Sequence, residues 1–237
     1  MRAIIAGGVD VGDHDRLVRV LTPDQGRTAV LVRGVRGGRK NHLSTAITPG
    51  AHVDLELRKG RGPLPLLRDA QVLASPNRAR TDLLRLSQLS YGVEVCSELA
   101  PEHHEAERLF KLLLSWLACV EGDEPPGAAT RQALEAKALT FAGMAPSLVA
   151  CAVCGDRLED PTVFSFDAGG GCHGRCAQGR ATSAAALVRL EALRRTALAQ
   201  TVGVAPVEPS WLLGDAVEWN LGRGMKSRSM LEEVEDD

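Results

Sequence analysis

Cys151-Ala152-Val153-Cys154 and Cys172-His173-Gly174-Arg175-Cys176 are the two stretches around which the rest of the sequence is organised. The first pair of thiols has the spacing CxxC, the second has CxxxC, and seventeen residues separate the two pairs. Two such pairs can fold back on each other so that four sulfurs converge on one tetrahedral ion. Glycines beside both pairs permit the positive φ angles that such turns need. The pattern predicts one structural zinc ion, with four ligands: Cys151, Cys154, Cys172 and Cys176.

Other interpretations of these cysteines remain open at this point. The four thiols can form disulfides, or can be unrelated buried residues, although the spacing favours a metal site. His173 is a possible substitute ligand for one cysteine of the second pair. Cys96 and Cys119 lie within helical apolar patterns, so we expect them to be core residues.

Length, composition and charge set the outer limits of the interpretation. The chain has 237 residues, of which 44% are hydrophobic, and this favours two or three small domains over a disordered or fibrous protein. No apolar run is long enough to cross a bilayer, and the apolar part of the first residues is too short for a signal peptide. We therefore expect a cytoplasmic protein with no membrane partner.

The net charge of −2 conceals a basic first third. Residues 1–80 carry fourteen Lys and Arg against seven Asp and Glu, which gives this part a net charge of +7. Such an imbalance is typical of a face that binds a polyanion. A solvated basic surface without a ligand is the alternative.

Residues 1–80 show the short apolar runs and turn residues of an all-β unit. The clearest run is His52–Arg58, in which apolar and polar residues alternate. A unit with five strands of this length fits a small OB-type barrel, a fold often used to bind oligonucleotides. The predicted strands are Ala3–Ala6, Arg16–Leu21, Thr28–Val35, His52–Arg58 and Leu64–Leu73.

Basic residues of this unit gather around two glycine-bearing turns, where they can grip phosphates from both sides of a groove. Residues 1–80 contain no Phe, Trp or Tyr, so the usual stacking platform for bases is missing from them. We expect binding to the DNA backbone that tolerates sequence and depends steeply on salt. The predicted DNA-binding residues are Arg33, Arg36, Arg39, Lys40, Arg58, Lys59 and Arg61.

From Thr81 onward the apolar period is that of helices. Thr81 is a plausible N-cap for the first helix, which Pro101 ends, and the residues from Leu231 to Asp237 suggest a frayed acidic tail. The predicted fold is α+β: a barrel over residues 1–80, a helical domain over 81–150, a zinc knuckle over 151–180, and the rest of the helical domain over 181–237. The other predicted helices are 102–120, 128–142, 184–199 and 211–221.

The sequence has no P-loop, nucleophile elbow, HExxH motif or dinucleotide fingerprint, so we do not expect an enzyme. One competing hypothesis is a zinc-ribbon scaffold for other proteins that does not bind DNA. Another is a metal-dependent nuclease that uses Asp10, Asp13 and Asp15 to hold Mg²⁺.

Several motifs in order resemble the bacterial DNA recombination and repair protein RecO family. Asp15-Arg16-Leu17-Val18 and Arg33-Gly34-Val35-Arg36 resemble its opening, and Gly143 to Gly155 resembles its helix end and first cysteine pair. Leu221-Gly222-Arg223 and Lys226-Ser227-Arg228 resemble its closing motif. One departure is the second cysteine pair, which is usually CxxC in that family.

The resemblance implies an N-terminal OB-fold, a helical domain and an inserted zinc knuckle. It also implies a cytoplasmic, nucleoid-associated recombination mediator that binds single-stranded and double-stranded DNA and promotes strand annealing. Such a mediator works with RecR and single-stranded DNA-binding protein to load the RecA recombinase. The DNA-binding residues of the family carry over best to Arg33, Arg36, Arg39 and Lys40.

Overall fold

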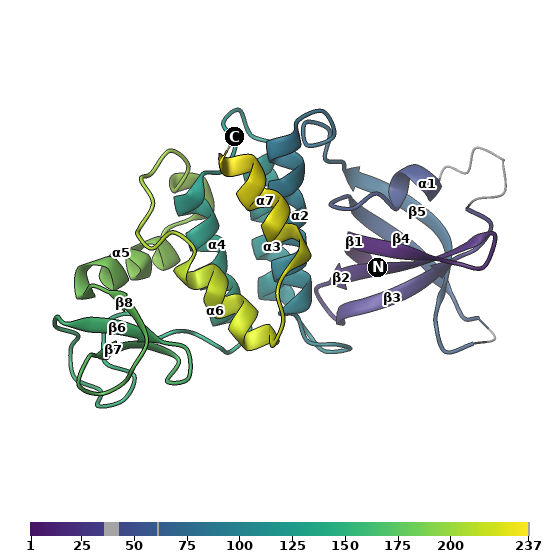
Figure 1. The fold of residues 1–237 in the computed structure, drawn as a ribbon. Coiled ribbons are helices and arrows are strands. Elements are labelled where there is room, and N and C mark those ends of the chain that lie inside the picture. Colours follow the sequence, from purple (N-terminus) through teal and green to yellow (C-terminus); the bar gives the residue numbers. More distant parts are fainter. Residues whose placement is uncertain (36–42, 61, 237) are drawn as a thin grey trace. The chain divides into compact units, whose positions relative to one another are not determined.

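A computed structural model describes residues 1–35, 43–60 and 62–236 of the chain. The described residues divide into two compact units, Met1–Glu121 with Ser229–Asp237 and Gly122–Arg228. The fold is α+β as predicted, with a barrel at the N-terminus followed by helices (Figure 1).

The first unit begins with a closed barrel of five strands in the order β1-β2-β3-β5-β4. The strands are β1 Arg2–Val11, β2 Asp15–Thr22, β3 Gly26–Val32, β4 His52–Arg58 and β5 Leu66–Ala74. All neighbouring pairs are antiparallel except β3 and β5, which are parallel. Alternate side chains of these strands fill the interior, among them Ile5, Val18, Val20, Val30 and Val53.

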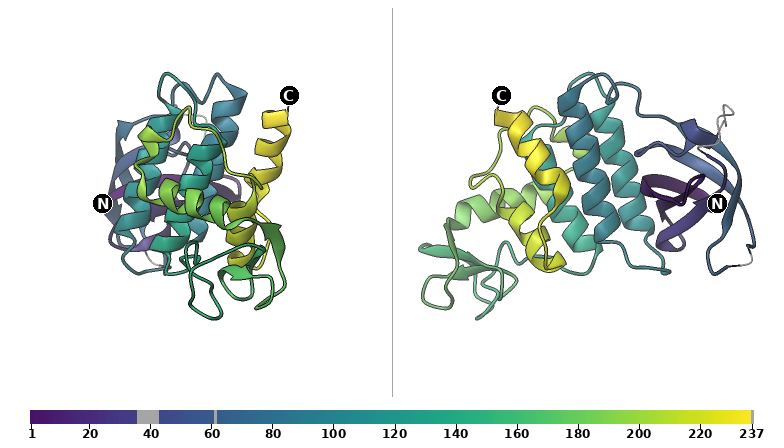
Figure 2. Two further views of the ribbon diagram at one scale, coloured as in Figure 1. Left: turned by 90° about the vertical axis from the view of Figure 1, so that its left-hand side faces the viewer. Right: turned by 45° about the vertical axis from the view of Figure 1, so that its right-hand side comes forward.

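Three helices complete most of this unit: α1 Leu43–Ala46, α2 Leu83–Glu98 and α3 Glu107–Val120. The predicted N-cap of α2 is wrong by one residue, because the side chain of Asp82, not Thr81, accepts the N–H of Arg85. α2 and α3 run side by side (Figures 1 and 2). They pack closely at Gly92, where the fully buried Trp116 donates its indole N–H to the carbonyl of Gln88 at 2.9 Å.

The second unit contains α4 Ala128–Phe141, α5 Ala184–Arg195, the 3-10 turn η1 Leu198–Gln200 and α6 Leu212–Leu221. Between α4 and α5 lies a three-stranded antiparallel sheet in the order β7-β6-β8. Its strands are β6 Thr162–Ser165, β7 Gly170–His173 and β8 Arg180–Thr182, and the sequence patterns did not predict them.

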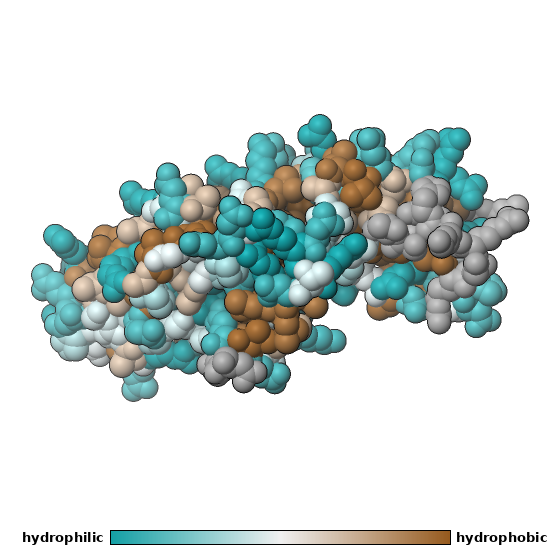
Figure 3. All heavy atoms as spheres, turned by 90° about the horizontal axis from the view of Figure 1, so that it is seen from above, coloured by the Kyte–Doolittle hydropathy of each residue, from teal (hydrophilic) through white to brown (hydrophobic). Residues whose placement is uncertain are grey.

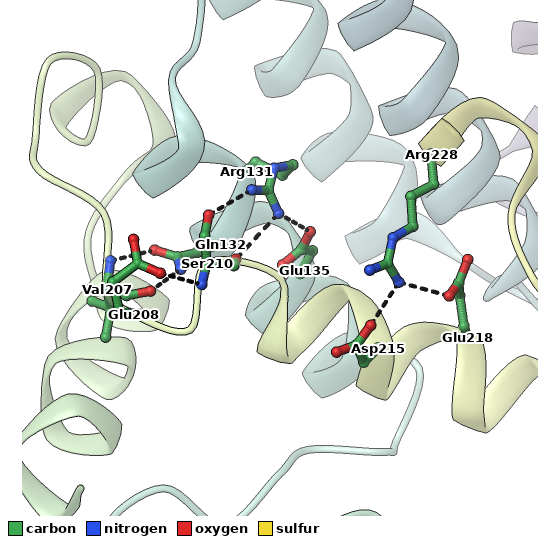
Figure 4. A network of polar contacts seen from close by, with 9 residues as sticks. All are labelled: Arg131, Gln132, Glu135, Val207, Glu208, Ser210, Asp215, Glu218 and Arg228. Atoms are coloured by element: carbon green, nitrogen blue, oxygen red, sulfur yellow. Dashed lines mark hydrogen bonds and ion pairs between the residues drawn. The ribbon is translucent and has the colours of Figure 1, made fainter. Parts of the chain in front are cut away.

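A buried polar network fastens the chain before α6 to α4 (Figure 4). Arg131 is 1% exposed and contacts the Glu135 carboxylate at 3.0 Å and the Ser210 hydroxyl at 2.9 Å. Its guanidinium carbon lies 3.4 Å from the ring centroid of Trp211, and that of Arg228 lies 4.7 Å from the same centroid. Gln132 exchanges two hydrogen bonds with the backbone of Val207. Because these charges are paired, their burial is tolerated.

The last helix, α7 Lys226–Asp236, corrects the prediction of a frayed tail. Leu231 is fully buried and Ser227 is nearly so, and the two residues are one helical turn apart. A mostly polar composition therefore concealed a helix with a buried side.

In the described residues, no helix is both long enough and apolar enough to span a membrane. On the face drawn in Figure 3, hydrophilic side chains are interspersed with smaller apolar areas.

Candidate metal knuckle and basic barrel surface

The first cysteine pair sits on a tight turn whose backbone hydrogen bonds fix the positions of the thiols. The N–H of Gly155 donates to the carbonyl of Cys151 at 2.9 Å, and Gly155 adopts a φ of 80°, which favours glycine. The N–H of Ala152 donates to the carbonyl of Gly171 in β7 at 2.8 Å. This bond brings the turn to the strand that carries the second group of candidate ligands.

Four side chains converge at this place: Cys151, Cys154, His173 and Cys176. One ligand atom from each lies within 4.8 Å of the other three. The Nδ1 atom of His173 is 3.5 Å from the Sγ of Cys154 and 4.0 Å from the Sγ of Cys176. A tetrahedral ion with bonds of about 2.3 Å to sulfur separates its ligand atoms by about 3.8 Å. The donor set therefore fits zinc, for which three cysteines and one histidine form a known structural set.

His173 is oriented as a metal-binding histidine should be. Its other ring nitrogen, Nε2, lies 3.1 Å from the backbone carbonyl of Arg157. A proton on Nε2 donates to that carbonyl and leaves the lone pair of Nδ1 directed at the sulfurs. The side chain is 7% exposed, so water competes little for either nitrogen.

Cys172, a predicted ligand, is not among the four grouped side chains. It is fully buried, and its Sγ lies 3.7 Å from the carbonyl oxygen of Gly170. Burial, together with the nearby Cys151, raises the pKa of the Cys172 thiol. At Cys151 the hydrogen bond from the Cys154 backbone is the main cause that lowers the pKa, to about 6, against the opposing effect of burial.

The other two cysteines are core residues, as expected. Cys96 in α2 is fully buried and Cys119 in α3 is nearly so. Burial raises the pKa of both thiols, which disfavours the reactive thiolate.

The barrel brings together the described members of the predicted basic cluster. Leu66, at the start of β5, is the partner of both Leu31 in β3 and Arg58 in β4. Arg33, which directly follows β3, and Arg58 with Lys59, at the end of β4, therefore flank the same short stretch of β5. All three side chains are exposed. The predicted residues Arg36, Arg39, Lys40 and Arg61 lie outside the described residues.

Several other barrel cations are already engaged by carboxylates. Arg16 pairs with Asp10 at 3.6 Å, Arg27 with Glu102 at 3.0 Å, and Arg68 with Glu56 at 2.7 Å. Within the part of the chain that the structure describes, Arg33, Arg58 and Lys59 have no such ion pair. These three, together with the exposed Arg2 at the start of β1, are described cations of the barrel strand ends that remain available to phosphate.

The acidic residues of the nuclease hypothesis do not form a metal site. The Asp15 carboxylate accepts the backbone N–H of Gly34 at 3.1 Å, and Asp10 faces Arg16. Over residues 1–35, 43–60 and 62–236, the knuckle is the one place where three or more potential ligands gather. The structure gives Asp10, Asp13 and Asp15 no common centre for Mg²⁺.

A five-stranded OB-type barrel, a set of helices and an inserted Cys/His knuckle define a class of modular proteins built around an oligonucleotide-binding fold. Comparison with known families narrows the class. The model described as "Recombination protein O N terminal" matches residues 1–76, and "Recombination protein O C terminal" matches residues 80–229. The chain belongs to the recombination protein O (RecO) family.

Curated relatives agree over nearly the whole length. DNA repair protein RecO of Anaeromyxobacter dehalogenans strain 2CP-C is 32% identical over 245 residues, which cover 99% of this chain and 96% of the relative. The protein of the same name from Myxococcus xanthus is 29% identical over 236 residues, with coverage of 98% and 96%. That of Pelobacter propionicus is 27% identical over 241 residues, with coverage of 100% and 97%.

Proposed function

We propose that this protein is a DNA repair and recombination mediator, and not an enzyme, that binds single-stranded and double-stranded DNA and promotes annealing of complementary strands. We also propose that the protein helps RecR to load the RecA recombinase, and that it works with single-stranded DNA-binding protein. Membership of the RecO family and relatives named as DNA repair proteins support this proposal.

The observation that carries the DNA-binding part is the pattern of ion pairs on the barrel. A cation that already has a carboxylate partner gains little from a phosphate, whereas an exposed cation without one gains a charge-assisted hydrogen bond. Arg33, Arg58 and Lys59 are of the second kind and flank one stretch of β5. We propose that they bind phosphates together with Arg36, Arg39, Lys40 and Arg61.

Annealing follows from the same chemistry. Cations that neutralise two DNA backbones reduce the repulsion between the strands without occupying the edges of the bases. The bases then remain free to pair. A surface of this kind tolerates any sequence.

The knuckle has a structural part in this proposal. Cys151, Cys154, His173 and Cys176 would hold one zinc ion, and the ion would cross-link the turn after α4 to β7 and the turn that follows it. The alternative set proposed from the sequence has Cys172 in place of His173.

Binding of a labelled oligonucleotide over a salt series tests the DNA site. Replacing Arg33, Arg58 and Lys59 together by Ala should weaken binding to every sequence and lower the slope of log affinity against log salt by about two to three. Arg68→Ala is the matched control, because Arg68 is also exposed on the barrel but is paired with Glu56. The control should keep the slope of the parent protein.

A triple variant that is folded and keeps both its affinity and its salt slope would exclude these residues as the DNA site. If the parent protein binds neither DNA form, a protein-interaction scaffold becomes the better proposal. Addition of Mg²⁺ to the same samples, followed by analysis of DNA length, tests the nuclease alternative, and we expect uncut DNA.

A further inference from the structure

The second unit contains a cavity of about 470 Å³ that the sequence did not reveal. The end of α4, the turn after β6 and the last turns of α6 line it, and Phe164, Phe166 and Trp219 contribute aromatic rings. Its size falls within the range of about 300 to 1,000 Å³ that small-ligand sites occupy.

The rings form an ordered group with one open face. The ring centroids of Phe164 and Phe166 are 5.3 Å apart in an edge arrangement, and those of Phe166 and Trp219 are 5.8 Å apart with a tilt of 30°. Phe164 is buried, whereas Trp219 is 54% exposed. An exposed indole that is supported from behind by other rings provides a rigid surface on which a further ring can stack.

The charges around the cavity indicate what kind of molecule fits. Asp167 lines the cavity, and the lining contains no Lys or Arg. Asn220 also lines it, and its amide nitrogen already donates to the carbonyl of Ala216 at 2.7 Å, so its oxygen remains to accept. The guanidinium of Arg180 lies 5.8 Å from the ring centroid of Phe166 but already pairs with Asp215. A phosphate or an acidic peptide would therefore meet the Asp167 carboxylate without a free counter-charge. A neutral ring that carries N–H donors meets acceptors instead.

The distribution of aromatic residues leads to the same ligand. Residues 1–80 have no Phe, Trp or Tyr, so the barrel cannot stack bases. Among the described Phe, Trp and Tyr residues, only Phe141 and Trp219 are exposed, and Phe141 does not line the cavity. Trp219 is therefore the exposed ring of the described chain that combines a free face with a cavity beside it.

We propose that this cavity binds one unpaired nucleobase of single-stranded DNA, stacked on Trp219, with Asp167 or Asn220 accepting a hydrogen bond from an N–H on its edge. This inference rests on the proposed DNA-binding function. It adds to that function a site that contacts a base directly, whereas the barrel cations are proposed to contact only phosphates. Such a site favours single-stranded DNA, because bases in a duplex are already stacked and paired.

The test compares two fluorescently labelled oligonucleotides of equal length and charge, oligo-dT and an abasic chain with the same phosphates. The parent protein should bind oligo-dT about tenfold more tightly than the abasic chain. Trp219→Ala should bind both equally, and Trp219→Phe should keep most of the preference. Phe141→Ala, which removes an exposed ring outside the cavity, should behave as the parent protein does.

Separate results identify which proposal fails. Replacing Arg33, Arg58 and Lys59 by Ala should weaken binding of both oligonucleotides and leave their ratio near tenfold. Equal binding of both by the parent protein, or a preference that survives in Trp219→Ala, overturns the nucleobase site and leaves the barrel site standing. Quenching of Trp219 fluorescence by an acidic apolar peptide but not by oligo-dT likewise overturns it. Absence of any binding to either oligonucleotide overturns both proposals.

Discussion

At the scale of single residues, the position of one strand determines which side chains meet at the knuckle. β7 ends at His173, so Cys172 and His173 are neighbours on a strand, and the side chain of Cys172 also lies close to Cys151. His173 faces Cys154 and Cys176, while the Sγ of Cys172 lies near the carbonyl of Gly170. The spacing of the cysteines predicted Cys172 as the fourth ligand, and the grouping of side chains in the structure adds His173 as the alternative.

This geometry predicts an unequal effect of two similar substitutions. Cys176→Ser should lose the zinc, as should Cys151→Ser, because each removes a thiolate from the group of four. Cys172→Ser should keep about one zinc per chain. Elemental analysis of protein purified without chelators measures the metal, and the absorption spectrum of the cobalt-substituted protein distinguishes three sulfur ligands from four.

His173→Gln completes this comparison. We expect it to bind zinc more weakly than the parent protein and to lose the spectrum of a site with one nitrogen ligand. If Cys172→Ser loses zinc while His173→Gln retains it, the ligand set is the four cysteines that the spacing predicted.

At the scale of elements, the hydrophobic pattern of a segment predicted its bounds correctly where that segment's own residues determine the structure. β4 occupies His52–Arg58 as predicted, because each alternate residue of this strand faces the barrel interior. The start of α3 was predicted at Glu102, but the helix begins at Glu107. The intervening residues pair with the barrel: the N–H of Arg27 donates to the carbonyl of Pro101, and that of Ala106 donates to Pro23. Because these contacts join residues far apart in the sequence, they produce no periodic pattern of apolar residues from which the start of the helix could be predicted.

The packing of α2 on α3 predicts that Gly92→Ala destabilises the protein. In an exposed helix this change stabilises by about 1 kcal/mol, because glycine is a poor helix former. Here the added methyl group would overlap the indole of Trp116, which cannot move without losing its bond to Gln88. Overpacking of this kind costs about 1 to 3 kcal/mol. Urea denaturation measures the free energy of unfolding.

A double variant provides the control for this prediction. Trp116→Phe removes part of the ring that the methyl group meets, so Gly92→Ala should cost less in that background than alone. Simple additivity of the two free-energy changes would show that the helices do not meet at this point.

At the scale of the whole molecule, the distribution of charged and apolar residues along the chain predicted the order of barrel and helices. The excess of cations in residues 1–80 and the change of apolar period at Thr81 suffice to predict a basic barrel followed by helices. The sequence patterns did not predict the aromatic cavity. Phe166 lies in the turn after β6 and Trp219 lies in α6, and no rule of sequence spacing connects two such residues. A site assembled by tertiary packing can be seen only when the chain is folded.

The division into two compact units predicts the effect of removing the metal. The candidate zinc ligands all lie within Gly122–Arg228, and the barrel interior is filled by its own apolar side chains. Chelation should therefore remove the hydrogen-exchange protection of β6, β7 and the turn at Cys151, where the proposed ion holds separate segments together. The amides of β2 and β4 should keep their protection, because their partners are other barrel strands.

Hydrogen exchange read by mass spectrometry, before and after chelation, measures both regions in the same sample. Cys172→Ser, which should retain zinc, serves as the control: before chelation it should show the protection of the parent protein in both regions, and after chelation the same local loss. Equal loss of protection in β4 and β7 would show instead that the two units unfold together. Unchanged protection of β7 would show that backbone pairing with β6 is sufficient and that the ion adds little to the stability of the knuckle.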